Sequence, residues 1–115
     1  MSKNSDKLLI VWSSGDVEVA KKMVLLYSSV ILPRRYWDEA HLMVWGPSAK
    51  LLAENEELQK MVKEIAATGV AISVCVVCSD DYGVTEVLRA LGVEPIHTGE
   101  LLTEALKTDW KVITV

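Results

Sequence analysis

The sequence predicts an α/β fold, a three-layer α/β/α sandwich with a parallel sheet of about five strands. Short apolar runs rich in Val and Ile alternate with segments whose apolar residues recur every three or four positions. No Asn-Gly or similar hairpin turn joins neighbouring apolar runs, so adjacent strands are expected to run parallel. Val and Ile fill most positions of residues 70–77, as expected for a strand covered on both faces.

Length and composition define the class of protein. A chain of 115 residues fits one domain, and we expect a disordered tail at residues 1–6 and a single domain at residues 7–115. Hydrophobic residues make up 50% and charged residues 24%, as in folded globular proteins. No apolar run approaches the roughly 20 residues of a membrane span, and the polar start is unlike a signal peptide. A cytoplasmic protein with no membrane partner is therefore expected.

Charge and glycine patterns disfavour nucleic acids and nucleotides. The formal net charge is −4, and basic residues pair only at Lys21-Lys22 and Arg34-Arg35, unlike the basic patch of a nucleic-acid binder. Residues 13–16 contain one glycine where dinucleotide binding needs G-x-G-x-x-G, and no phosphate-binding G-x-x-x-x-G-K-[ST] motif occurs. We expect no nucleic-acid partner and no cofactor.

A strand and a long helix begin the predicted domain. Residues 7–12 are expected to form a buried strand, because five apolar residues follow one another before a Ser-Ser-Gly-Asp turn. Residues 16–32 have apolar side chains at spacings of three and four, which predicts an amphipathic helix. Pro33 ends this helix, and the two arginines that follow suit the negative end of its dipole.

A second strand and two helices follow. Residues 40–45 are mostly apolar and precede a Gly-Pro pair, through which no strand can continue. Ser48 is expected to cap a short helix. The apolar stripe at residues 58–65 predicts a further helix, which ends at Gly69 as its C′ glycine.

The second half continues the alternation. Residues 70–77 are the third strand, and the Ser-Asp-Asp segment that begins at Ser79 is expected to cap a helix at residues 83–91. The remaining expected elements are a short strand at residues 94–98, a helix at 99–107 and a last strand at 110–115.

The unusual side chains follow the predicted strands. Carboxyl ends of parallel strands meet at one edge of a sheet, and ligands of open α/β sheets bind beyond that edge. The candidate catalytic residues are Cys75 and Cys78, and the candidate substrate-binding residues are Trp12, Ser13, Trp45, Gly46, Ser79 and His97.

The cysteine pair is the strongest chemical signal. Two cysteines placed at random would be separated by two residues only about 2 % of the time. In a cytosolic chain such a pair favours redox or metal chemistry over a disulfide framework. A helix N-terminus would favour the Cys78 thiolate, whereas Asp80 and Asp81 would disfavour it, and the sequence does not decide between these effects.

Other interpretations of the pair stay open. Cys75 could be a small buried hydrophobe and Cys78 a turn residue without function. The intervening Val-Val and the place after the third strand are unlike a thioredoxin motif. A structural zinc site needs four ligands, and the Cys-x-x-Cys pair supplies only two of them. His97 could act as a third ligand or as a base, but we predict no metal site.

Aromatic residues indicate self-association. Trp12 and Trp45 could wall a pocket, or they could pack in the core or at a subunit interface. Together with Tyr36, Trp37 and Tyr82, which we expect to be exposed, they favour a homo-oligomer.

Residues 69–75, Gly-Val-Ala-Ile-Ser-Val-Cys, followed by a helix and by residues 91–93, resemble the DsrE-like family, which includes the TusD and YchN proteins. The resemblance extends to residues 7–12, to the turn at 44–46 and to the closing helix that starts at 99–102, so it covers nearly the whole chain. Its individual motifs are weak. The order of elements and the cysteine at the end of the third strand carry the resemblance.

The resemblance implies a role in sulfur handling. Family members with this cysteine carry sulfur as a persulfide, pass it along a protein relay and often assemble as trimers or hexamers. By position, Cys75 matches the sulfur-carrying cysteine, and Cys78 is an addition that could resolve the persulfide, tune it or bind metal. The expected function is a sulfur-relay or persulfide carrier with sulfur-donor and sulfur-acceptor protein partners, transferring sulfur without a full catalytic constellation. The alternatives are a non-catalytic oligomeric module that binds a metal or small ligand at this turn, and a structural subunit.

Overall fold

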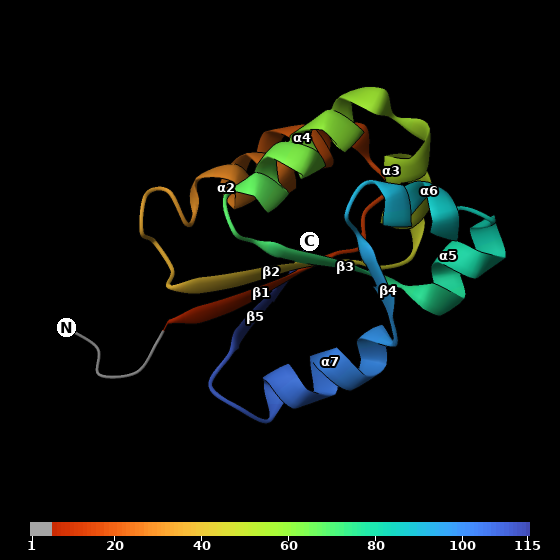
Figure 1. Ribbon diagram of the computed structural model, residues 1–115. Helices are drawn as coiled ribbons and strands as arrows, with labels where there is room; N and C mark the ends of the chain where they lie inside the picture. Colours follow the sequence, from red (N-terminus) through yellow and green to blue (C-terminus); the bar gives the residue numbers. More distant parts are fainter. Residues whose placement is uncertain (1–5) are drawn as a thin grey trace.

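The computed structural model describes residues 6–115, which form a five-stranded parallel sheet with the strand order β4-β3-β2-β1-β5 (Figure 1). All four strand pairs are parallel, as the absence of hairpin turns predicted. The strands are β1 (Lys7–Trp12), β2 (Glu39–Val44), β3 (Ala71–Cys75), β4 (Glu94–Ile96) and β5 (Lys111–Thr114).

Helices cover the two faces of the sheet unequally (Figure 1). Within residues 6–115, α7 (Thr98–Leu106) is the one helix on its face, and α5 (Val76–Tyr82) lies at the carboxyl end of β3. The opposite face is covered by α1 (Val17–Val19), the π-helix η1 (Ala20–Val24), α2 (Leu25–Val30), α3 (Pro47–Glu54), α4 (Glu56–Ala67) and α6 (Thr85–Ala90). The three-layer α/β/α prediction is confirmed.

Two hydrophobic cores explain why the strands are apolar at consecutive positions. In β1, Leu8, Ile10 and Trp12 point into the large core under the many helices. Leu9 and Val11 point into the small core under α7. Alternate side chains of a strand leave opposite faces, so a strand buried on both sides is apolar throughout. The same alternation decides which residues can reach a site beside α7.

The expected tail at residues 1–6 falls mostly outside the described residues. Asp6 is described, and it is held by the chain ahead of β2. Its backbone N–H donates to the Asp38 carboxylate at 3.0 Å, and its carbonyl accepts from the Asp38 N–H at 2.9 Å. These two hydrogen bonds join Asp6 to the segment that precedes β2, and the disordered tail stays a prediction.

The helix predicted at residues 16–32 has the expected position but three segments. Asp16 caps α1, since one carboxylate oxygen accepts from the N–H groups of Glu18 and Val19. The chain then passes through the π-helical η1 into α2. An apolar periodicity locates a helix but does not reveal a local widening of its turns.

The third strand is shorter than predicted. β3 ends at Cys75, and the β-branched Val76 and Val77 are the first residues of α5. Strand propensity depends on context, and these two valines are helical although Val77 is 58% exposed. Cys75 is consequently the N-cap residue of α5, and Ser79 lies inside this helix instead of capping a later one.

Several smaller boundaries also differ. α5 ends at Gly83, whose φ of 70° is left-handed, and α6 is shorter than the predicted helix at residues 83–91. Ser48 does not cap α3, because Gly46 is the N-cap residue and the Ser48 hydroxyl donates to the Trp12 carbonyl. The predicted fourth strand ends early because α7 already begins at Thr98. Gly69, with a φ of 106°, follows the C-cap of α4 as predicted.

None of the helices within residues 6–115 has the length and apolar character needed to span a membrane.

Candidate functional site

A cavity of ≈ 950 Å³ lies beyond the carboxyl ends of β3 and β4, against the first turns of α7. This is the sheet edge at which the sequence predicted a site. Cys75 closes β3 and Cys78 lies in the first turn of α5, and both line the cavity. The opposite wall comes from α7 and its N-cap residue His97.

Cys75 has surroundings that favour its thiolate. The residue is 7% exposed, and burial by itself raises the pKa of its thiol. The Thr98 hydroxyl and the backbone N–H of Cys78 act against burial and lower this pKa. The Cys78 thiol and the Val77 N–H act in the same direction, so the pKa of Cys75 lies below its ordinary value. The N-terminal end of α5 thus supplies donors to the residue that begins it.

Cys78 has the opposite electrostatic balance. Burial raises the pKa of its thiol, and the hydrogen bond with Cys75 raises it further. The backbone N–H of Gly46 lowers this pKa, but the negative charges of Cys75 and Asp81 raise it, and the net shift is upward. Both cysteines are free thiols. The Cys75 thiol is therefore the more acidic of the pair, and Cys78 is the one that holds its proton more strongly.

Thr98 is a site residue that the sequence analysis did not select. It is the first residue of α7 and is 1% exposed. Its Oγ1 has no hydrogen-bond partner within residues 6–115, but it lies close enough to Cys75 to lower the pKa of that thiol. A buried hydroxyl without a partner is costly, so this donor is available to a thiolate or to a ligand in the cavity. Adjacency of β4 and β3 brings Thr98 to Cys75, and strand order was not predictable from the sequence.

Three predicted substrate-binding residues lie at the cavity. Trp45 and the exposed His97 line it. Gly46 contributes through its backbone, which hydrogen-bonds to Cys78. Its φ of 74° and ψ of −138° lie in a region that glycine alone adopts readily. The β2–α3 connection is therefore built around a glycine that aims its N–H at the second thiol.

The other three predicted substrate-binding residues do not line the cavity. Trp12 is 0% exposed in the large core, because its place in β1 directs it away from α7. The Ser13 hydroxyl donates to the Val115 carbonyl at 3.1 Å. The Ser79 hydroxyl donates to the Val76 carbonyl at 3.2 Å and bonds to Thr85 Oγ1 at 2.7 Å. These serines hold local structure together.

Two exposed carboxylates on α7, Glu100 and Glu104, also line the cavity. They lie four positions apart and therefore share one helix face. No motif in the sequence identified them, because exposed glutamates on a helix are common. The described residues contain no group of three or more His, Cys, Asp or Glu side chains placed to hold a metal ion.

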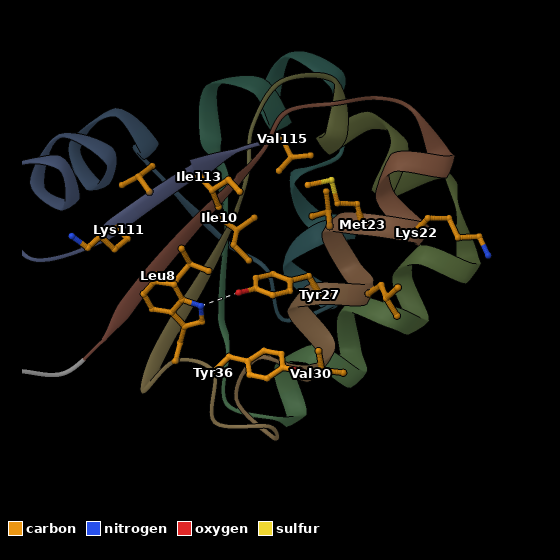
Figure 2. Close-up of a pocket in the computed structure, with 14 residues that line it drawn as sticks. Leu8, Ile10, Lys22, Met23, Tyr27, Val30, Tyr36, Lys111, Ile113 and Val115 are labelled. Atoms are coloured by element: carbon orange, nitrogen blue, oxygen red, sulfur yellow. Dashed lines mark hydrogen bonds between the residues drawn. The ribbon is translucent and has the colours of Figure 1, made fainter. Parts of the chain in front are cut away.

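A second cavity, of ≈ 680 Å³, is mostly apolar and lies between η1–α2 and strands β1 and β5. Figure 2 shows Met23 and Tyr27 extending from the helix toward Ile10 and Ile113 on the strands. The Tyr27 hydroxyl accepts a hydrogen bond from Trp37 Nε1 at 2.9 Å. Its ring stacks on Tyr36 with ring centres 6.4 Å apart. We call this surface the apolar groove.

The fold and the first cavity define a small parallel α/β protein with a cysteine of lowered pKa at the carboxyl end of its third strand. Residues 20–115 match the DsrE/DsrF-like family, and the chain belongs to this family. The resemblance described from the sequence is thereby confirmed.

Solved structures show the same fold. A conserved protein of unknown function from Bacteroides thetaiotaomicron has a TM-score of 0.92 and 29% identity, over 96% of this chain and 95% of that chain. The ychN protein from E. coli has a TM-score of 0.67 and 19% identity, over 96% and 99%, and at that identity the likeness concerns the fold alone. No curated protein matches the chain.

Proposed function

We propose that this protein is a sulfur carrier that holds sulfur as a persulfide on Cys75 and passes it to a partner protein. One observation carries the proposal. The Cys75 sulfur lies in an open cavity with the Thr98 hydroxyl and the backbone N–H groups at the start of α5 favouring its thiolate. Its position at the end of the third strand matches the sulfur-carrying cysteine of DsrE-like proteins. A carrier needs a reachable, stabilised thiolate more than a full catalytic constellation.

Loading begins with attack by the Cys75 thiolate on the outer sulfur of a donor persulfide, R–S–SH. A bond forms between Cys75 Sγ and that sulfur, the donor S–S bond breaks, and the donor leaves as R–S⁻. The product is Cys75–S–SH. Delivery repeats this chemistry, because the acceptor thiolate R′–S⁻ attacks the outer sulfur, giving R′–S–SH and regenerating the Cys75 thiolate.

Cys78 tunes the carrier and can also discharge it. As a protonated thiol it donates to the Cys75 sulfur. If it loses its proton, its thiolate can attack the inner sulfur of Cys75–S–SH, which forms a Cys75–Cys78 disulfide and releases HS⁻. The raised pKa of Cys78 slows this loss of sulfur at neutral pH. The main role of Cys78 is therefore to tune the Cys75 thiol, and its attack on the persulfide is a side reaction.

The proposal includes sulfur-donor and sulfur-acceptor protein partners in the cytoplasm, and self-association through the apolar groove. Met23 at 50% exposure, Leu26 at 55% and Ile113 at 41% border the groove. Exposed apolar patches of this kind often mark protein interfaces. β5 is an edge strand, so one side of its backbone lacks a strand partner in the described sheet. A trimer or hexamer is the assembly that family membership favours.

The test is intact-mass analysis after incubation with a persulfide donor, followed by removal of excess donor. The wild type should gain about 32 Da, the mass of one sulfur, and Cys75→Ser should gain nothing. Cys78→Ser should keep the adduct and retain it longer, since no resolving thiol remains. A wild type that gains no sulfur would overturn the proposal. Zinc that co-purifies at a fixed ratio without sulfur loading would favour the metal-binding alternative.

A further inference from the structure

We propose that the cavity lined by Cys75 and Cys78 binds a segment of a partner protein. In this segment, basic side chains flank the cysteine whose thiol reacts with Cys75. This inference deepens the proposed function and rests on it for the identity of the reaction. It concerns the charge of the partner, which the relay chemistry alone leaves undetermined.

The first observation is the charge of the cavity rim. Glu100 and Glu104 line the cavity from α7 and are exposed, so they retain their charge at little cost. Neither carboxylate forms an ion pair within the described residues, where the pairs are Lys21–Glu57 and Arg89–Glu86.

The second observation is that no strongly basic side chain balances these carboxylates at the cavity. No Lys or Arg is among the described residues that line it, whereas Lys22 and Lys111 both line the apolar groove elsewhere. An approaching group therefore meets two carboxylates on α7, with His97 as the one basic side chain in the lining.

The third observation points to a ligand that enters deeply. Thr98 Oγ1 and Cys75 are both buried where they line the cavity, and this hydroxyl has no hydrogen-bond partner among the described residues. A thiol must reach past the carboxylates to meet the sulfur. The volume of ≈ 950 Å³ accommodates several side chains of a peptide segment. Complementary charge would steer such a segment, whereas small anionic thiols would be repelled.

The experiment measures disulfide exchange at Cys75, which needs no persulfide. Two peptides, Gly-Lys-Cys-Lys-Gly and Gly-Glu-Cys-Glu-Gly, are blocked at both ends and activated on cysteine as 2-pyridyl disulfides. The Cys75 thiolate attacks the peptide sulfur, a Cys75–peptide disulfide forms, and pyridine-2-thiolate leaves and is followed by absorbance. The protein carries Cys78→Ser, so that the mixed disulfide is not resolved.

We expect the lysine peptide to react at least about tenfold faster than the glutamate peptide at low salt, as electrostatic steering allows. The preference should shrink strongly near 1 M salt, where the Debye length is about 3 Å. It should also shrink in Glu100→Gln/Glu104→Gln. Glu64→Gln, a matched change on an exposed residue of α4, should leave it intact.

Equal rates for the two peptides at low salt, or a preference that survives both substitutions, would overturn the inference. Rates are compared with those of a 2-pyridyl disulfide of 2-mercaptoethanol, which removes differences in intrinsic Cys75 reactivity. Failure of persulfide loading with an intact peptide preference would remove the relay and keep the charge selectivity. Successful loading without a preference would keep the relay and remove the inference.

Discussion

The Thr98 hydroxyl lies close enough to the Cys75 sulfur to lower the pKa of that thiol, although one residue begins α7 and the other ends β3. The hydroxyl is buried and has no hydrogen-bond partner within residues 6–115. The pair links the position of α7 to the protonation state of the thiol, because the helix carries one of the donors that stabilise the thiolate.

Thr98→Val should raise the pKa of Cys75, because it removes the hydroxyl donor at nearly constant volume. We expect the rate of Cys75 alkylation by iodoacetamide at pH 7 to fall roughly three- to tenfold. Thr98→Ser keeps the donor and should restore most of the rate. Unchanged pH–rate profiles in Thr98→Val would contradict the assigned role of the hydroxyl.

Limiting alkylation should modify Cys75 before Cys78, although Cys78 is the more exposed residue. The reason is that the pKa of Cys75 is lowered and that of Cys78 is raised. Peptide mass spectrometry after a short exposure to substoichiometric iodoacetamide measures the order. Labelling governed by exposure alone would appear first on Cys78.

The free energy of unfolding of the Cys78→Ser variant should increase with pH relative to that of the double variant Cys75→Ser/Cys78→Ser. The folded pKa of Cys75 lies below the ordinary value of 9.0, so the native state releases this proton first. The resulting stabilisation is complete above the ordinary value and is lost as pH falls through the folded pKa. Urea unfolding of both variants between pH 6 and 9.5, under reducing conditions, measures the difference. A difference that is flat or falls with pH would be incompatible with the lowered pKa.

Gly46→Ala should destabilise the protein by about 1–3 kcal/mol, because a side chain is strained at this positive φ even though open space surrounds it. Any backbone shift would also weaken the N–H contact with Cys78 and raise the pKa of that thiol further. Gly99→Ala is the matched control, since Gly99 lies in a helix at an ordinary φ with open space around it. Thermal unfolding of the two variants tests the comparison, and equal losses would refute it.

Ile113→Glu should reduce the assembly size if the apolar groove mediates self-association. The substitution places a charge on β5 at a position that is 41% exposed, so the monomer should fold while the interface is disrupted. Val87→Glu, an equally exposed apolar position on α6, is the control. Sedimentation velocity measures both. A wild-type monomer, or an Ile113→Glu variant with the wild-type assembly, would exclude this interface.

The sequence predicted the sheet well because its central strands are apolar on both faces and its helices have clear periodicity. β1 was placed at its observed bounds, and the cysteine at the end of the third strand was expected at the carboxyl edge. Val76 and Val77 misled the prediction, since β-branched residues favour strands, whereas the chain enters α5 directly after Cys75.

The site was harder to predict because it depends on the order of the strands and on the face of the sheet toward which each strand residue points. Trp12 follows the right strand but points into the large core. Thr98 reaches Cys75 only because β4 is the neighbour of β3. Exposed glutamates such as Glu100 give no signal until a cavity is seen beside them.

Because the sheet is covered unequally, α7 both covers the smaller core and forms one wall of the cavity that contains the two cysteines. That core holds only Leu9, Val11, Met43 and Ala105 at full burial, so undocking α7 costs less apolar contact than disturbing the opposite layer. Local opening would remove the Thr98 donor and widen access to Cys75 in one motion. Amide hydrogen exchange along α7 should therefore slow when a partner occupies the site, so helix protection would report on binding.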